Sequence, residues 1–470
     1  MRRLFIAASP GELRGAVADS EGLLDFRLVR TVGRSMVGDL FLGRIVKLLP
    51  ALRAALVDIG QERAAFLSAA DAAPRHGLSS LTEGATVLVQ VKRDARADKA
   101  AAVTLRLRLS GPILDWTPTR PSVVVEEIAR EARERVAALV AGLLRPDEGV
   151  RLLAGAADAP PERLEAAIAA LRARWTRIEE RRAGAEPPAC LEAMPPLAGL
   201  LDALVDDRLD EVLVDDPIVL AEARGWLSRE RAPLAGRISL HRGSAIFEAA
   251  DLAEAVASLL ELRVNLPGGG ALTIEPTAAA TLIDVDSGAL EGEPAGGEDA
   301  LLAVNLAATT AIARQIRLRG LAGALVVDFI GLHQRDRRER LLEAFRTALE
   351  THVPDAQLLG WTKLGHIELT QRRQQAPLHE IVFERTSYGG YIKSTLTVAL
   401  EALAAVERRV AAEPARAPEL RVHPAVAAIL AGEAAPALQA LEARMGRKLP
   451  VLSEPARARA SFDIGDRQPI

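Results

Sequence analysis

The chain has 470 residues, about three times the length of a typical domain, so we expect several hydrophobic cores. Hydrophobic residues at 49% and charged residues at 26% are globular proportions, which exclude a disordered or fibrous chain. No uninterrupted apolar run of about 18 residues occurs, and the first residues turn polar too soon for a signal peptide, so we expect a soluble, cytoplasmic protein. The single cysteine, Cys190, excludes an internal disulfide framework and a thiolate zinc site, so any metal must be held by oxygen or histidine ligands.

Charge is distributed unevenly along the chain. The net charge of −4 does not by itself indicate a nucleic-acid-binding protein. Residues 36–108 and residues 311–373, however, each contain 11 Lys or Arg against 7 Asp or Glu, so the rest of the chain carries −12. Such basic segments would suit a polyanion bound locally, and ordinary solvated surfaces would look the same.

The amino-terminal part of the chain predicts small β structures followed by helices. Residues 1–35 have the pattern of a hairpin with Gly22 at the turn. In residues 36–108, five short apolar stretches separated by Gly, Pro and Asp predict a small closed barrel. Residues 122–142 and 161–180 have helical spacing, and the Pro- and Ala-rich stretch that follows predicts a linker or domain edge.

The rest of the chain alternates between strand and helix patterns, as expected of α/β units. We expect strands at residues 211–215, 271–275, 280–286 and 324–330, and helices at residues 218–227, 251–263, 305–320 and 335–350. Residues 357–370 predict one or two further strands. The Ala-rich residues 394–470, with their proline breaks, predict a small helical domain.

Aspartates end two of the predicted strands. Asp284 and Asp286 lie in LIDVDSG (282–288), and Asp328 lies in ALVVDFI (324–330). Because strand ends of an α/β sheet open onto the crevice where ligands bind, the three carboxylates would form an oxygen-rich site suited to Mg²⁺ and a phosphate. The chemistry of such a site is attack of water on a phosphodiester. The alternative, that these residues only form turns or cap a helix, stays open at this point.

The predicted barrel carries an aromatic residue and basic residues suited to a nucleic-acid strand. Phe66 on a barrel face would stack on an RNA base, and burial in the barrel core explains it equally well. The basic residues that would follow the phosphates are Arg44, Lys47, Arg53 and Arg63, joined by Lys92, Arg93, Arg96 and Lys99 in the loop that follows.

Four stretches of this sequence together resemble the ribonuclease E/G family. Residues 42–67 are similar to its S1-type domain. Residues 265–288, 305–332 and 359–373 are similar, in order and at plausible spacing, to its deoxyribonuclease-I-like catalytic domain. The resemblance implies a Mg²⁺-dependent endoribonuclease that cleaves single-stranded RNA in rRNA or mRNA processing or decay, leaving a 5′ phosphate and a 3′ hydroxyl.

The resemblance also implies a multidomain α+β fold in which an S1-type OB-fold barrel is inserted into a ribonuclease-H-like subdomain. The implied division is residues 1–35 and 196–259 for the two parts of the ribonuclease-H-like subdomain, 36–108 for the S1-type RNA-binding domain, 109–195 for a degenerate 5′-sensor-like region, 260–376 for the deoxyribonuclease-I-like catalytic domain, 377–393 for a vestigial zinc-link segment and 394–470 for a small helical domain.

The family's site residues can be placed on this sequence one by one. Its two magnesium-binding, catalytic aspartates fall on Asp284 and Asp328. An asparagine of the family pattern falls on Asp286, which adds negative charge. The resemblance leaves two roles for this residue: a third, supporting catalytic ligand, or a change in the affinity for the metal.

The family's RNA-binding residues are only partly kept. Its two base-stacking phenylalanines fall on Leu56 and Phe66, so one of the two is aromatic here. The basic loop residues that help to bind RNA fall on Arg93, Arg96 and Lys99.

This sequence departs most from the family where the family senses the RNA 5′ end. The arginine–threonine pair for the 5′ phosphate falls on Leu152 and Leu153, and the glycine of a contact loop is absent from residues 118–128. Leucine offers a phosphate no donor, so we expect weak 5′-monophosphate dependence, with Arg151 as a partial substitute.

A second departure concerns the zinc link. The family's Cys-Pro-x-Cys element falls on FERTSYGGYIKS (383–394), with Arg385 and Tyr388 near the cysteine positions. We therefore expect no structural zinc, and any homodimer would be held by packing alone. These departures leave two other interpretations open: a catalytically degenerate RNA-binding or scaffold protein of the same family, and an unrelated Mg²⁺-dependent phosphatase.

Overall fold

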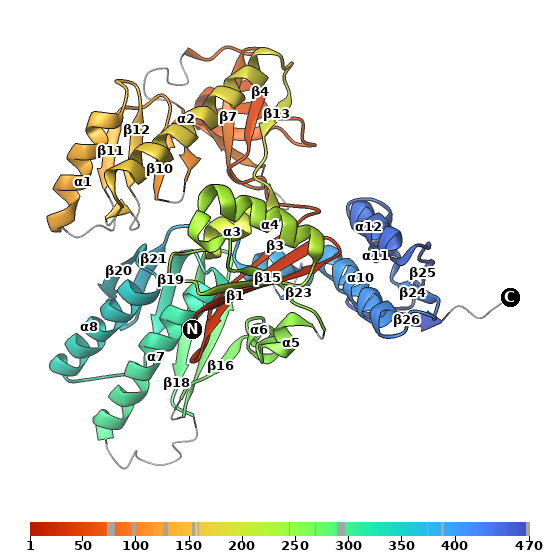
Figure 1. Ribbon diagram of the computed structural model, residues 1–470. Coiled ribbons are helices and arrows are strands. Elements are labelled where there is room, and N and C mark those ends of the chain that lie inside the picture. The colour runs from red at the N-terminus through yellow and green to blue at the C-terminus, as the bar shows by residue number, and fades with distance from the viewer. Residues whose placement is uncertain are drawn as a thin grey trace. The chain divides into compact units, whose positions relative to one another are not determined.

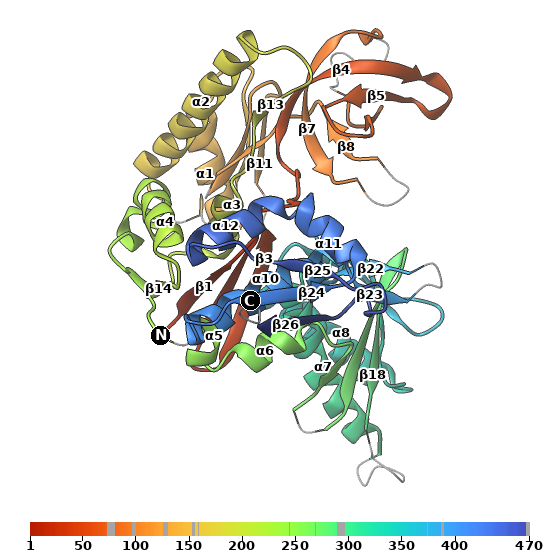
Figure 2. The ribbon, with the colours of Figure 1, turned by 90° about the vertical axis from the view of Figure 1, so that its right-hand side faces the viewer.

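The computed structural model describes residues 1–72, 80–95, 100–111, 113–125, 130–152, 156–157, 159–243, 245–267, 269–288, 297–373, 375–386 and 390–466 (Figures 1 and 2). The chain forms two compact units. One consists of residues 1–34 and 196–470, and the other, residues 35–195, is inserted between them in the sequence.

The inserted unit begins with a closed five-stranded barrel. Its strand order is β4-β5-β6-β8-β7, and β7 pairs back onto β4. The strands are β4 (Leu40–Leu49), β5 (Ala54–Asp58), β6 (Ala65–Ser68), β7 (Thr86–Arg93) and β8 (Ala102–Thr104). Gly43 allows β4 and β5 to approach, because a Cβ at this position would lie 2.9 Å from the carbonyl oxygen of Asp58. The barrel predicted for residues 36–108 is confirmed, and its closure is consistent with an OB-type fold.

The rest of this unit is a four-stranded sheet with two helices. Its order is β11-β12-β10-β9, and its core includes Trp116, Leu152 and Ile168. The elements are β9 (Leu109–Ser110), β10 (Leu114–Thr117), β11 (Ser122–Val125), α1 (Arg130–Leu143), β12 (Gly149–Leu152) and α2 (Pro161–Ala183). The stretch predicted as a linker also contains a strand, β13 (Ala189–Glu192), which pairs with β4. Residues 122–125, predicted as the start of a helix, form the strand β11 instead, as their run of valines favours.

The second unit opens with a mixed sheet built from two parts of the chain. Its order is β15-β14-β1-β2-β3. The elements are β1 (Arg3–Ser9), β2 (Glu12–Asp19), β3 (Gly22–Arg30), α3 (Pro196–Leu204), β14 (Glu211–Val214), α4 (Pro217–Glu230), β15 (Ile238–Leu240), α5 (Ile246–Ala249) and α6 (Ala253–Ser258). The hairpin predicted at the amino terminus is thus the first part of a three-stranded meander. The strand and helix predicted after residue 210 are confirmed, and Asp216 caps α4 by accepting from the N–H groups of Ile218 and Val219.

The second sheet of this unit has six strands and a single parallel pair. Its order is β16-β17-β18-β19-β21-β20, and the crossover helix α7 joins the parallel strands β18 and β19. The elements are β16 (Arg263–Asn265), β17 (Ala271–Pro276), β18 (Ala280–Asp286), α7 (Gly297–Arg319), β19 (Gly323–Asp328), α8 (Arg335–His352), β20 (Ala356–Trp361) and β21 (Ile367–Gln371). The strands and helices predicted here are confirmed.

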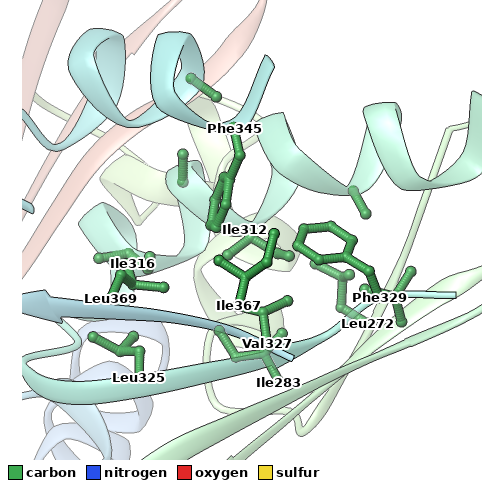
Figure 3. Close-up of a cluster of buried hydrophobic side chains, with 14 of the residues drawn as sticks. Leu272, Ile283, Ile312, Ile316, Leu325, Val327, Phe329, Phe345, Ile367 and Leu369 are labelled. Atoms are coloured by element: carbon green, nitrogen blue, oxygen red, sulfur yellow. The ribbon is translucent and has the colours of Figure 1, made fainter. Parts of the chain in front are cut away.

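Helices α7 and α8 pack on one face of the six-stranded sheet (Figure 1). The core between the sheet and these helices contains Ile283, Val327 and Ile367 from the strands and Phe345 from α8, as Figure 3 shows. Phe345 is fully buried and meets Phe329 edge to face, with ring centroids 5.6 Å apart. The opposite face of the sheet carries polar side chains together with exposed leucines, among them Leu282.

Buried ion pairs join this sheet to the amino-terminal one. Asp25 on β3 is only 3% exposed, and its carboxylate accepts from Arg27 Nη1 at 2.6 Å and from Arg317 Nε at 2.8 Å. Arg314 donates to the carbonyl oxygen of Leu23. Because Arg314 and Arg317 both belong to α7, the crossover helix is attached to β3.

The carboxy-terminal part is not purely helical, which corrects the prediction for residues 394–470. It contains α10 (Thr395–Ala412), α11 (Pro424–Ala431) and α12 (Ala435–Met445), and also a three-stranded sheet β25-β24-β26 of β24 (Pro418–Val422), β25 (Val451–Ser453) and β26 (Phe462–Asp466). Before it, α9 (Leu378–Val382) leads into the hairpin β22 (Phe383–Arg385) and β23 (Tyr391–Lys393). Among the helices of the described residues, no single helix has the length and apolar composition of a membrane span. Helices α11 and α12 meet these two criteria only when they are taken together, and a 78° bend separates them.

Candidate active site

The site is built on the parallel pair of strands in the six-stranded sheet. Along β18, Ile283 and Val285 face the core, so Asp284 and Asp286 project from the opposite face. On β19, Val327 faces the core and Asp328 projects from the same polar face. The register pairs Asp284 with Asp328 directly, at the carboxyl ends of both strands. The sheet therefore brings together two of the three predicted site residues as immediate neighbours.

The end of β19 is held in place by a buried amide. Asn305 on α7 is fully buried, and its side chain makes both hydrogen bonds that the backbone of Ile330 offers. Asn305 Nδ2 donates to the carbonyl oxygen at 2.8 Å, and Oδ1 accepts from the N–H at 3.1 Å. This contact fixes the chain two residues beyond Asp328.

A second contact fixes the loop that continues from there. Glu298, in the first turn of α7, accepts from the N–H groups of His333 and Gln334 and pairs with Arg337. These bonds lower the pKa of Glu298, with the His333 N–H as the largest cause. Helix α7 thus positions the chain on the carboxyl side of Asp328 at two points.

Asp286 has partners that differ from those of the other two aspartates. Its Oδ1 accepts from the N–H of Gly288 at 2.9 Å, and its Oδ2 lies 3.5 Å from Arg263 Nη2. A Cβ at Gly270 would lie 2.6 Å from the carbonyl oxygen of Asp286, and Gly270 has φ +85°. The turn between β16 and β17, which packs against the end of β18, therefore requires glycine at position 270. Arg263 offsets part of the Asp286 charge.

Negative charge accumulates at Asp284. Burial raises the pKa of Asp284, and the neighbouring carboxylates of Asp328 and Asp286 raise it further. In the described part of the chain, no lysine or arginine forms an ion pair with Asp284 or Asp328. A cation between the two carboxylates would relieve this repulsion.

The donor set fits a hard divalent cation. Mg²⁺ is usually bound through one or two carboxylates, and waters and substrate phosphates supply the remaining ligands. Asp284 and Asp328 provide the two carboxylates. No group of three or more His, Cys, Asp or Glu side chains among the described residues is arranged to hold a metal ion.

A histidine that the sequence analysis did not single out lies against Asp328. His366 Nδ1 is 3.0 Å from Asp328 Oδ1. Asn305 and His366 are thus the functional candidates that sequence reasoning missed. The only signal for His366 was its place at the start of a predicted strand next to β19, which does not reveal the register.

On the barrel, the two positions expected to stack on bases are neighbours. Leu56 on β5 and Phe66 on β6 are register partners, both are partly exposed, and neither belongs to the barrel core. Lys47 on β4 is the register partner of Leu56 on the other side. A basic residue, an aliphatic one and an aromatic one therefore form one row across the strands.

The remaining RNA-binding candidates are exposed where they are described. Arg44, Lys47 and Arg93 are exposed on the barrel strands, as are Arg53 and Arg63 in the connections between strands. Arg96 and Lys99 lie outside the described residues.

The positions of the family's 5′ sensor carry no phosphate-binding arrangement where they are described. Leu152 is fully buried in the core of its sheet, and Leu153 lies outside the described residues. The side chain of Arg151 is only 16% exposed and lies 3.7 Å from Asp115 Oδ2. In the zinc-link segment Arg385 is exposed at the end of β22, and Tyr388 lies outside the described residues.

Comparison with known proteins places this site in a family. Residues 109–374, more than half of the chain, match the model of the ribonuclease E/G family. Ribonuclease G of Escherichia coli (strain K12) is 29% identical over 483 aligned residues that cover 98% of this chain and 99% of the relative. Ribonuclease G of Haemophilus influenzae is 28% identical with 98% of each chain covered, and ribonuclease E of Synechocystis sp. is 30% identical over 75% of this chain and 55% of its own length. The chain described here is a member of the ribonuclease E/G family.

Proposed function

We propose that this chain is a Mg²⁺-dependent endoribonuclease that hydrolyses phosphodiester bonds of single-stranded RNA. Membership of the ribonuclease E/G family makes it an endoribonuclease. The observation that supports the metal-dependent mechanism is the direct register pairing of Asp284 with Asp328, together with the raised pKa of Asp284.

Asp284 and Asp328 would hold the cation, and Asp286 would support it from the same strand. When bound, Mg²⁺ would polarise the scissile phosphate and lower the pKa of the attacking water. Water adds to phosphorus, the bond from phosphorus to the 3′ oxygen breaks, and that oxygen takes up a proton. The products carry a 5′ phosphate and a 3′ hydroxyl.

The hydrogen bonds that fix the end of β19 would keep the carboxylate of Asp328 beside Asp284 during this reaction. Asn305 and Glu298 hold the backbone that follows Asp328, so the two carboxylates keep their spacing when a charged phosphate approaches. Charged groups that are already in position stabilise a transition state most, because the protein does not have to rearrange them as the reaction proceeds.

The barrel would bind single-stranded RNA. Phe66 is exposed enough to stack on a base, and Arg44, Lys47 and Arg93 would contact phosphates. Arg96 and Lys99, which lie outside the described residues, are proposed as further RNA-binding residues. Leu56 replaces the second stacking side chain with an aliphatic contact, which lowers the affinity for a splayed base.

We further propose that cleavage depends only weakly on a 5′ monophosphate. The buried Leu152 offers no donor, and Arg151 faces Asp115 from a largely buried position. Neither residue is placed to accept a phosphate.

The domain scheme of the family is proposed for the whole chain. The two-part sheet of β1–β3 with β14–β15 supports a ribonuclease-H-like subdomain that the barrel interrupts, and the sheet with its single α7 crossover supports a deoxyribonuclease-I-like catalytic domain. The boundaries of the compact units, after residues 34 and 195, fit a barrel inserted at about residue 36 and a return at 196.

A cleavage assay tests the proposal. A short fluorescent single-stranded RNA should be cut by the purified protein with Mg²⁺ and left intact with EDTA. Asp284→Asn and Asp328→Asn should abolish cutting, whereas Glu275→Gln, which removes an exposed carboxylate from the neighbouring strand β17, should not. Binding without Mg²⁺-dependent cutting would instead identify an RNA-binding member of the family, and turnover of small phosphate esters alone would identify a phosphatase.

A further inference from the structure

His366 lies beside one of the two paired carboxylates. Its Nδ1 is 3.0 Å from Asp328 Oδ1, and its side chain is 33% exposed while that of Asp328 is 58% exposed. The histidine is therefore the more enclosed of the two partners.

Strand pairing builds this contact. β21 runs antiparallel to β19 with Val327 opposite Ile367, so the next position along places His366 beside Asp328. The backbone of His366 is fixed by the turn before it. Its N–H donates to Thr362 Oγ1 at 3.2 Å, and its carbonyl oxygen accepts from the N–H of Thr362 at 2.8 Å.

The direction of the hydrogen bond follows from the chemistry of the groups. An ionised carboxylate only accepts, so Nδ1 of His366 carries the proton and donates. Both the neutral imidazole with its proton on Nδ1 and the imidazolium can donate in this way, so the contact does not depend on the charge of the ring. The bond occupies Oδ1 of Asp328 and leaves Oδ2 without this partner.

We propose that His366 is a positioning residue that holds the Asp328 carboxylate in the orientation that binds the divalent cation together with Asp284. This inference rests on the proposed function. Carboxylates that bind metals are themselves held by hydrogen bonds, and loss of such a partner typically weakens metal binding about 10- to 100-fold. His366 is not assigned as a third ligand, because no group of three such side chains in the described ranges is arranged around an ion.

The test measures Mn²⁺ binding to the full-length protein without RNA, by electron paramagnetic resonance or calorimetric titration. His366→Leu removes the donor and should weaken Mn²⁺ binding about 10- to 100-fold. His366→Asn keeps an N–H donor near the position of Nδ1 and should recover most of the affinity. Thr370→Val, a change on the same strand and the same face, should leave the affinity unchanged.

The outcomes separate the inference from the function on which it rests. Native affinity in His366→Leu overturns the positioning role. Equal loss in His366→Leu and His366→Asn also overturns it, because the imidazole would then coordinate the ion itself. No Mn²⁺ binding by the native protein, or binding that survives Asp328→Asn, contradicts the proposed site and not only the role of His366.

Discussion

Asp284 and Asp328 are register partners on parallel strands, and burial together with the other carboxylate raises the pKa of Asp284. The sheet therefore holds like charges next to each other, an arrangement that costs stability in the protein without a cation. Such a cost is common where a site is built for binding.

The first prediction concerns this repulsion. Asp284→Asn and Asp328→Asn should each reduce RNA cleavage at least about 100-fold while leaving the free energy of unfolding equal or higher, because each removes a like-charge contact. Mg²⁺ should raise the melting temperature of the native protein and not that of either variant. A variant that unfolds more easily than the native protein would contradict the electrostatic account.

The second prediction concerns the barrel row. Phe66→Ala should lower the affinity for single-stranded RNA by about 1–3 kcal/mol, with little effect on barrel stability, because the ring stacks on a base and lies outside the core. Leu56→Phe should raise the affinity, because it places a second aromatic ring beside the first. Fluorescence anisotropy with one oligonucleotide measures both, and Leu56→Met serves as a control for side-chain size.

The third prediction concerns the RNA 5′ end. Two oligonucleotides of one sequence, one with a 5′ monophosphate and one with a 5′ hydroxyl, should be cut at similar rates. The reason is that Leu152 is buried and Arg151 lies beside Asp115. A rate for the monophosphate that is many times higher would mean that another part of the chain binds the phosphate.

The fourth prediction concerns pH. Burial raises the pKa of Asp215 to about 6 from the ordinary value of 3.8, although its carboxylate accepts from the N–H of Ala8 at 2.8 Å. The folded state thus binds a proton on Asp215 more tightly than the unfolded state does. The contribution of this protonated carboxyl to the free energy of unfolding is complete below about pH 4 and is lost as pH rises through about 6. The shift corresponds to about 3 kcal/mol.

Asp215→Asn should remove this loss, because the amide oxygen still accepts from Ala8 and no charge is buried. Urea unfolding at pH 4.5 and at pH 8 should show the variant gaining more stability over the native protein at the higher pH than at the lower. Glu230→Gln, which changes an exposed carboxylate at the end of α4, should leave the difference between the two pH values as it is.

The sequence was sufficient to predict the strands that carry the site. Apolar runs that end in aspartate predicted β18 and β19, and an amphipathic stretch between them predicted α7 as the crossover. These elements led to the expectation that Asp284 and Asp328 converge where strands of the sheet end. Their direct register pairing was not predicted and is a finding of the structure.

Contacts that depend on the register between strands far apart in the chain could not be predicted from the sequence. His366 directly precedes β21, which pairs with β19 in the opposite direction, and no local pattern reports that alignment. Asp286 was grouped with the other two carboxylates, yet the backbone turn directs it to Gly288 and brings Arg263 near it. The strands of the carboxy-terminal sheet were missed because they are three to five residues long and lie between or after Ala-rich helices.

The ion pairs of Asp25 bear on how the protein loses its structure. Pulling the helix α7 away from β3 would leave a carboxylate that is 3% exposed without Arg317, one of its two guanidinium partners, which is strongly unfavourable. The amino-terminal sheet and the sheet that carries Asp284 and Asp328 should therefore melt in a single cooperative transition, even though more than two hundred residues separate their first strands in the chain.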